Sequence, residues 1–326
     1  MYRVPRIADI RESMNMKRLV GLMLAGLWLC LVSLNPALAK EKKTEIPKGL
    51  KNKTEITYTF SEESGEHKKV PGDKEISLYD KKGNPIEYRC YTADDKFKSK
   101  KIVKYNEKGK VIETTQHDAD IELISKDVYK YDDQGNLTED ARYDAEGKLI
   151  NKNVCKYDDK GKVIELAWYD GGKLKNKFLL KYDDQDHEIE NSIYQGDGTL
   201  TLKTISKYND KGNAIERNSY TKEGVLLTKA ISKYDARNNL VEEMTYSSDD
   251  HLLSKSFYKY DGKDNEIEYK EILYLDDNAF EQKTLKKYDN QGNLIELTKY
   301  KTEGQSGPGA EIPVSQTTWE YEWYPE

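Results

Sequence analysis

Residues 130–136, Lys-Tyr-Asp-Asp-Gln-Gly-Asn, recur with small edits over most of the 326-residue chain, and this repetition constrains the fold most strongly. The tyrosines that mark successive copies are separated by 26, 26, 26, 25, 26, 26, 26 and 28 residues. They are Tyr79, Tyr105, Tyr131, Tyr157, Tyr182, Tyr208, Tyr234, Tyr260 and Tyr288. A tandem repeat predicts stacked copies that form one domain, in which each copy contacts mainly its neighbours.

Each copy carries the residues of a tight turn directly after its marking tyrosine, which we number as position 0. Position +1 is Asp or Asn in all nine copies, and position +4 is Gly in six. The other three copies have Asp186, Asn238 or Asp264 at position +4. Gly, Asn and Asp enter the left-handed backbone region most easily. The pattern is typical of a type I turn that closes a bulged hairpin.

A second turn follows in each repeat. Position +12 is Tyr in seven copies, and Gly or Asp usually follows four residues later. Ile121 occupies this later position once, and a β-branched residue fits the left-handed region poorly. We therefore expect the turn at residues 118–122 to differ in shape from the others.

The segments between the turns read as strands, because position −3 is apolar in all nine copies and no helical period is sustained. Two strands per repeat predict some eighteen antiparallel strands plus caps. The period of two puts both tyrosines of a repeat on one face, each across from an aliphatic residue beside its own turn. The position −3 and +7 aliphatics and the lysines take the other face.

Neither face is wholly polar, so an ordinary two-layer sandwich is not expected. The sequence predicts an all-β, elongated array of about nine hairpins. We expect it to form either an open, twisted, single-layer sheet or a sheet wound into a spiral.

Residues 1–39 have the parts of a secretory signal peptide. A basic pair, Lys17-Arg18, precedes an apolar run at residues 19–34, and Ala37-Leu38-Ala39 follows. The run is short for a membrane span, which needs about 20 residues. The chain starts either at Met1 or at Met16. We expect export to the periplasm, the cell surface or the medium, and a mature chain that begins near Lys40 without a transmembrane anchor.

The mature chain divides into a leader and one repeat domain. Residues 40–54 are Lys-rich without periodicity and predict a flexible leader. Residues 55–326 predict a single domain. In it residues 55–60 form an N-terminal cap strand, residues 76–304 carry the repeats, and residues 317–324 form an aromatic cap strand.

Removal of residues 1–39 leaves 48 basic and 57 acidic residues, a net charge of −9. This argues against nucleic acid as the main partner, which would call for a basic face. Cys90 and Cys155 lie two and a half repeats apart. We expect two separate thiols, because a disulfide needs Cα atoms within about 7 Å.

Charged side chains recur in register. Position −5 is Lys and position +8 is Glu in all nine copies, and position −1 is Lys in eight. Six position −5 lysines are candidate ligand contacts: Lys126, Lys152, Lys177, Lys203, Lys229 and Lys255. Cross-strand charge pairing and protection of the sheet edge explain the columns. The alternative is a periodic strip that binds an extended anionic polymer, which the glutamate columns weigh against.

Catalytic chemistry has little support in the sequence. The four histidines occupy unrelated repeat positions, and the adjacent carboxylates of the turns do not form a calcium loop. No carboxylate pair stands out from the repeat as a glycosidase acid and nucleophile would. The sequence predicts no enzyme activity, no metal site and no cofactor.

Residues 288–296 show the unit Tyr-Asp-x-x-Gly-Asn-x-Ile-Glu, which resembles the YD repeats of bacterial RHS-type proteins and, more distantly, MORN-type hairpin repeats. The resemblance covers about residues 76–304. RHS repeats typically carry Arg after the Gly, where this chain has Asn, Lys or His, and they wind many more copies into a shell around a toxin domain. The resemblance implies an exported, non-enzymatic hairpin scaffold, sometimes associated with carbohydrate or cell-surface binding.

Three functional hypotheses follow. The first is an exported monomeric scaffold whose repeated surface binds an extended glycan or protein. The second is a part of a larger RHS-like toxin or surface assembly. The third is a glycan-active enzyme, which a deep single pocket that interrupts the periodicity would favour.

Overall fold

The computed structural model describes residues 50–63, 66–275, 278–302 and 311–323, and the predicted signal peptide lies outside them. They form a 20-stranded antiparallel sheet. The strands are β1 (Leu50–Glu63), β2 (Glu66–Tyr79), β3 (Pro85–Tyr91), β4 (Phe97–Tyr105), β5 (Val111–His117), β6 (Leu123–Tyr131), β7 (Leu137–Asp144), β8 (Leu149–Tyr157), β9 (Val163–Asp170), β10 (Lys173–Tyr182), β11 (Glu188–Gln195), β12 (Leu200–Tyr208), β13 (Ala214–Tyr220), β14 (Leu226–Tyr234), β15 (Leu240–Ser247), β16 (Leu252–Tyr260), β17 (Glu266–Leu275), β18 (Asn278–Tyr288), β19 (Leu294–Thr302) and β20 (Glu311–Trp323).

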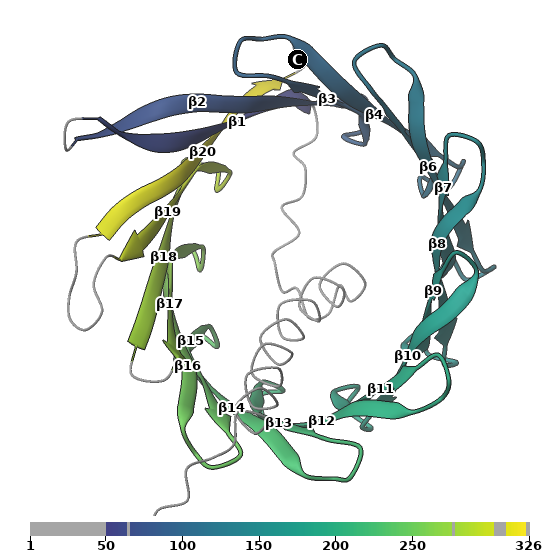
Figure 1. Cartoon of the computed structure of the whole chain (residues 1–326), viewed down its shortest axis with the longest axis vertical. Helices are drawn as coiled ribbons and strands as arrows, with labels where there is room; N and C mark the ends of the chain where they lie inside the picture. The colour runs from purple at the N-terminus through teal and green to yellow at the C-terminus, as the bar shows by residue number, and fades with distance from the viewer. Residues whose placement is uncertain (1–49, 64–65, 276–277, 303–310, 324–326) are drawn as a thin grey trace, which may run out of the picture. The chain divides into compact units, whose positions relative to one another are not determined.

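The sheet closes on itself. Each strand pairs with its neighbours in sequence, and β1 also pairs with β20, where Ile56 lies opposite Thr318. Figure 1 shows the strands following one another around a ring. The all-β hairpin prediction is confirmed, but the prediction of an open or spiral sheet is wrong. Closure leaves no row of unpaired backbone groups at an edge, which is the physical reason to prefer it.

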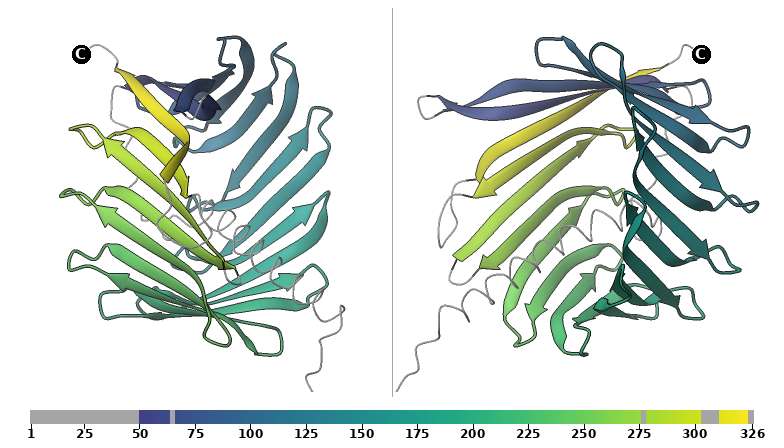
Figure 2. Two further views of the ribbon diagram at one scale, coloured as in Figure 1. Left: turned by 60° about the vertical axis from the view of Figure 1, so that its left-hand side comes forward. Right: turned by 45° about the vertical axis from the view of Figure 1, so that its right-hand side comes forward.

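The strands that close the ring are longer than the repeat strands. β1 and β2 have 14 residues each and β20 has 13, whereas β3 has seven. β1 includes residues 50–54, which were predicted as part of the flexible leader. Figure 2 shows β20 lying beside the long β1–β2 hairpin.

The first turns have the predicted geometry. The backbone N–H of Gly135 donates to the carbonyl of Asp132 (3.0 Å), and the Asp132 carboxylate accepts the N–H of Asn136 (2.7 Å). Asp186, Asn238 and Asp264 have φ angles of 72°, 76° and 63°, so all three adopt the left-handed conformation expected of them. The sequence pattern at position +4 therefore reports backbone conformation.

The turn at residues 118–122 does not differ from the others, contrary to the prediction. Ile121 has a φ of 69°, and its N–H donates to the Asp118 carbonyl (3.2 Å). The Asp118 carboxylate accepts the N–H groups of Asp120 and Glu122 at 3.0 and 2.9 Å. These hydrogen bonds hold the turn, so Ile121 bears the conformational cost itself.

A bulge in each repeat moves the side chains between faces. Lys156 pairs with Glu165, but the next residue, Tyr157, pairs with Val163, so Ile164 is an extra residue in β9. The position −1 lysine and the position +8 glutamate consequently share a face with the position −3 aliphatic residue. The marking tyrosine points to the opposite face.

The second tyrosine of the repeat, in contrast, lies on the same face as the lysines, because Lys152 pairs directly with Tyr169. The prediction that both tyrosines of a repeat share a face is therefore wrong, and the bulge is the reason. The predicted aliphatic partners are confirmed: Tyr157 pairs with Val163, and Tyr169 pairs with Leu174. We call the two surfaces the ion-pair face, which carries positions −5, −1, +8 and +12, and the mixed face, which carries the marking tyrosines.

The marking tyrosines tie each hairpin to the one before it. The hydroxyl of Tyr131 donates to the carbonyl of Val111 (2.7 Å), and that of Tyr157 donates to the carbonyl of Leu137 (2.6 Å). Equivalent bonds are made by Tyr105, Tyr182, Tyr208, Tyr234, Tyr260 and Tyr288. The repeat thus supplies a hydroxyl for a carbonyl that lies beyond the ladder of the sheet.

Candidate functional site

On the ion-pair face, the position −1 lysine and the position +8 glutamate form a salt bridge in eight of the nine repeats. Lys130 contacts Glu139 at 2.8 Å, and the equivalent lysine and glutamate of the other repeats are 2.6–3.0 Å apart. The pairs are Lys104–Glu113, Lys130–Glu139, Lys156–Glu165, Lys181–Glu190, Lys207–Glu216, Lys233–Glu242, Lys259–Glu268 and Lys287–Glu296. The predicted cross-strand charge pairing is therefore present.

Four of the six candidate lysines approach the same glutamates from the following repeat. Lys203 lies 2.8 Å from Glu190, whose other oxygen contacts Lys181 at 2.9 Å. The remaining three distances are 3.5 Å for Lys152–Glu139, 3.9 Å for Lys229–Glu216 and 3.6 Å for Lys255–Glu242. A glutamate between two lysines thus occurs at four of the eight pairs of this face.

Aromatic rings lie beneath several of these lysines. The ammonium groups of Lys152 and Lys177 lie 5.2 and 5.9 Å from the ring centres of Tyr169 and Tyr194. Lys126 pairs with Tyr143 in the strand register. All six candidate lysines therefore lie on the ion-pair face, four of them against a glutamate.

The hydrogen bond from Lys130 and the charge of Lys152 hold the pKa of Glu139 below its ordinary value, against a smaller effect of burial. Lys203 and Lys181 lower the pKa of Glu190 in the same way. These glutamates are carboxylates at neutral pH, and each serves two ammonium groups.

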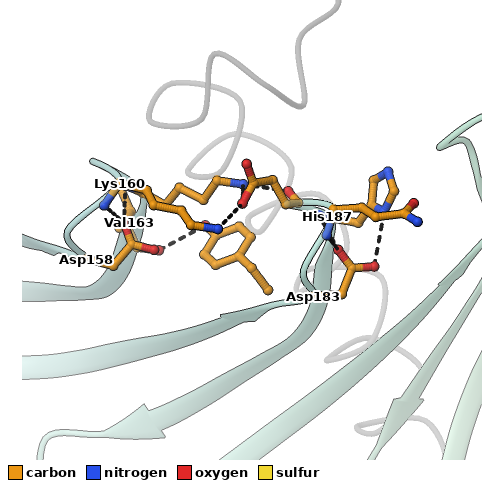
Figure 3. Close-up of polar contacts among 9 residues, drawn as sticks. Asp158, Lys160, Val163, Asp183 and His187 are labelled. Carbon is orange, nitrogen blue, oxygen red and sulfur yellow. Dashed lines mark hydrogen bonds and ion pairs between the residues drawn. The ribbon is translucent and has the colours of Figure 1, made fainter.

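The first turns lie along one rim, and polar contacts join successive turns (Figure 3). Asp158 accepts the N–H of Lys160 (3.0 Å), and Asp183 accepts both the N–H (2.8 Å) and the ring Nδ1 (3.1 Å) of His187. The His187 ring stacks on the ring of Tyr208 in the next repeat, with 4.5 Å between the two ring centres.

Each Asp or Asn that replaces Gly at position +4 bonds to the preceding turn. Asp186 contacts Lys160 at 3.3 Å and Lys162 at 3.0 Å. Asp264 accepts a hydrogen bond from Asn239 and forms an ion pair with Arg237, both at 2.9 Å. The third pair follows the same rule.

The third residue at position +4 is Asn238, and its side-chain amide and that of Asn213 in the preceding turn form hydrogen bonds with each other. Sequence reasoning missed these contacts. The available signal was a basic or amide residue 24–26 positions before each non-glycine residue at position +4.

An open groove of about 630 Å³ lies between the turns that follow Tyr260 and Tyr288. Its lining includes Ile267, Tyr288 and Lys286, and Lys286 contacts Glu266 at 2.9 Å. Glu266 occupies position +6, which is aliphatic in most repeats. Glu188 takes the same position in another repeat, and the lysines of the groove are already paired.

The seam between β1, β2 and β20 has a different charge arrangement. Glu55 lies directly opposite Glu75, and Trp319 donates its indole N–H to Glu55 (2.6 Å). Burial and the nearby Glu55 raise the pKa of Glu75, while burial lowers the pKa of Lys53. Glu75 also lines a cavity of about 270 Å³ with Tyr88, Cys90, Ser99, Lys101 and Gln116.

Within the described ranges, no group of three or more His, Cys, Asp or Glu is placed to hold a metal ion. Cys90 and Cys155 are both free thiols, as predicted. In the same part of the chain, no helix is long and apolar enough to cross a membrane.

Comparisons with known proteins give one family model and several solved structures that are similar to the chain. A family model described as an uncharacterised protein matches residues 119–203 and 199–279. No curated protein matches the chain.

Among solved structures, the chain is similar to a porin-like protein from Bacteroides uniformis, at 10% identity and a TM-score of 0.39. The alignment covers 83% of this chain and 97% of that one. A porin-like protein from Bacteroides vulgatus is 12% identical, with a TM-score of 0.24 and coverage of 82% and 98%. One chain of the TcdB2-TccC3-Cdc42 structure is 12% identical, with a TM-score of 0.16 and coverage of 75% and 18%.

Proposed function

We propose that the mature chain is an exported, non-enzymatic binding scaffold whose ion-pair face contacts an extended partner, a glycan or a protein, on several hairpins at once. One observation carries the proposal: the same lysine–glutamate–lysine unit recurs on four hairpins, at Glu139, Glu190, Glu216 and Glu242. Equivalent residues are two strands apart, which is about 9.6 Å in a sheet.

Repetition favours an extended partner because it multiplies weak contacts. A single exposed ion pair contributes about 0–1 kcal/mol. A partner that spans several hairpins makes each further contact within one complex, and its overall affinity then exceeds that of any single contact by orders of magnitude. A compact ligand would gain nothing from the copies that it does not reach.

The absence of catalysis is part of the proposal, and the groove beside Tyr288 supports it. Asp261 and Asp289, which line the groove, accept the backbone N–H groups of Asn265 and Asn293 within their own turns. A glycosidase needs one carboxylic acid and one free carboxylate on either side of the bond it cleaves. Here both carboxylates serve the turns.

Glycan arrays and pull-downs from cell-surface extracts test the proposal with residues 40–326. We expect binding to long polymers and much weaker binding to their short fragments, because only the former reach several hairpins. Silence of the folded protein in both experiments would contradict a binding function. Turnover of a bound glycan would favour an enzyme instead.

A further inference from the structure

The ion-pair face of strands β6–β17 carries more positive than negative charge. Six repeats contribute twelve lysines and six glutamates at positions −5, −1 and +8. The lysines are Lys126, Lys130, Lys152, Lys156, Lys177, Lys181, Lys203, Lys207, Lys229, Lys233, Lys255 and Lys259. The glutamates are Glu139, Glu165, Glu190, Glu216, Glu242 and Glu268. One lysine charge per repeat is therefore left without a matching glutamate.

Other side chains on this face do not remove the surplus. Position −3 is aliphatic or aromatic, and position +12 is Tyr in five of these six repeats and Ile272 in the sixth. Position +10 holds Ala, Ser, Asn, Met or Lys270. No other carboxylate occupies a paired strand position of this face between β6 and β17, although the mature chain is acidic as a whole.

We propose that this face binds an extended anionic polysaccharide with about one carboxylate per disaccharide; this rests on the scaffold function proposed above. The uncompensated lysine charge recurs every two strands, about 9.6 Å. An extended chain of pyranose sugars advances by about one disaccharide over that distance. Duplex DNA carries one charge per about 1.7 Å of its axis, which is far denser than the lysine column.

The position −5 lysines are the group that meets the polymer. Their contacts with the shared glutamates are longer than those of the position −1 lysines in three of four repeats, at 3.5, 3.9 and 3.6 Å. Such pairs contribute little, so a ligand carboxylate displaces them at small cost. The rings of Tyr169 and Tyr194 beneath Lys152 and Lys177 offer apolar faces to the sugar C–H groups beside that carboxylate.

Immobilised hyaluronan, which has one carboxylate per disaccharide, is the probe. The mature protein is compared with a quadruple variant, K152Q/K203Q/K229Q/K255Q, by surface plasmon resonance. We expect the variant to bind at least about tenfold more weakly, because four weak contacts are lost together. Binding by the unchanged protein falls as salt rises.

The matched control is K82Q/K108Q/K148Q/K211Q, which removes the same charge from exposed lysines in turns. We expect less than about a twofold loss, because screening weakens charges beyond a Debye length of about 8 Å. A second variant, E139Q/E190Q/E216Q/E242Q, enlarges the surplus and tightens binding. Circular dichroism checks that all three variants fold.

Several results would overturn the inference: hyaluronan retained no better than neutral dextran, equal losses in the two lysine variants, or tighter binding of single-stranded DNA of equal charge. Capture of a neutral glycan or a protein in the array and pull-down experiments would then leave the scaffold function standing. If no ligand is captured in those experiments either, both the polysaccharide binding and the scaffold function are contradicted.

Discussion

A glutamate of the repeat hairpins and a glutamate of the closing seam have pKa values that are shifted in opposite directions. In the repeats, Glu139 lies between Lys130 and Lys152, and its pKa is lowered. At the seam, Glu75 lies opposite Glu55, and its pKa is raised. One register is copied in the repeats, so the same lysine–glutamate pair recurs from hairpin to hairpin. The two facing glutamates of the seam lie in β1 and β2, where the lysine–glutamate pairing of the repeats is not continued.

The seam nevertheless continues one feature of the repeats. Tyr321 in β20 donates its hydroxyl hydrogen to the carbonyl of Leu294 (2.8 Å), as the marking tyrosines from Tyr105 to Tyr288 do to the hairpin before them. β20 is thus the first half of a tenth repeat, and β1 completes the ring in place of the second half. Closure needs one strand that the repeat does not encode.

Breaking the seam has the largest expected effect. Thr318 lies in the middle of β20, between Glu296 of β19 and Ile56 of β1. Thr318→Pro removes a donor from a strand that is paired on both sides, and we expect a loss of about 3 kcal/mol or more. Urea unfolding measures it, with Thr318→Ala as the control that keeps the backbone donor. Equal stability of the two variants would show that β20 does not close the ring.

Relief of strain at Ile121 should raise stability within the repeats. Its φ of 69° costs a β-branched residue about 1–2 kcal/mol, and the side chain is 57% exposed. We expect Ile121→Gly to stabilise the protein by about 1 kcal/mol in thermal or urea unfolding. The matched change, Gly147→Ala at a φ of 81°, should destabilise by a similar amount. A loss of stability in Ile121→Gly would contradict the proposed strain.

Removal of a tyrosine hydroxyl tests whether the hydrogen bond from a tyrosine to a carbonyl of the preceding hairpin stabilises the repeats and the seam equally. Tyr131→Phe and Tyr321→Phe each lose a hydrogen bond to a carbonyl, and we expect about 1 kcal/mol from each. Tyr143→Phe is the control, since its hydroxyl donates no hydrogen bond within the described residues. A markedly smaller effect for Tyr321 would mean that β20 does not continue the repeat.

The two glutamates should give pH effects of opposite sign. The pKa of Glu139 is lowered in the folded state, so its contribution is present above the ordinary value of 4.5 and is lost as pH falls. The pKa of Glu75 is raised, so its contribution is present below 4.5 and is lost as pH rises.

At pH 7 we therefore expect Glu139→Gln to destabilise the protein by about 0.5 kcal/mol and Glu75→Gln to stabilise it. Both differences should shrink towards pH 3. Unfolding curves at pH 3, 5 and 7 check the signs, and the same sign for both variants would contradict the contrast between repeat and seam.

The sequence was most informative where one local rule acts. The turn conformation of Asp186, Asn238 and Asp264 follows from residue type alone, because few residues tolerate a positive φ. Ile121 adopts a positive φ despite its residue type, because the hydrogen bonds of its turn outweigh the backbone strain.

Longer-range features were harder to predict. The extra residue at position +7 is Ile or Val in eight of nine copies, as an ordinary strand residue would be, so the bulge and the face of the glutamates were unknown until the register was seen. Closure was missed because the pairing of β1 with β20 joins residues more than 250 positions apart. The only sequence sign of the contacts between turns at Asp186 was the presence of Lys160 and Lys162 one repeat earlier.

Disulfide trapping across the seam tests closure most directly. Thr57 and Thr317 are paired in β1 and β20, and adjacent Cα atoms in such a pair lie about 5 Å apart. In a Cys90→Ser, Cys155→Ser background, T57C/T317C should oxidise to an intramolecular disulfide within the monomer, detected by mass spectrometry. The control T57C/T204C, with Thr204 in β12, should remain reduced. Free thiols or only intermolecular disulfides in T57C/T317C would contradict a closed ring.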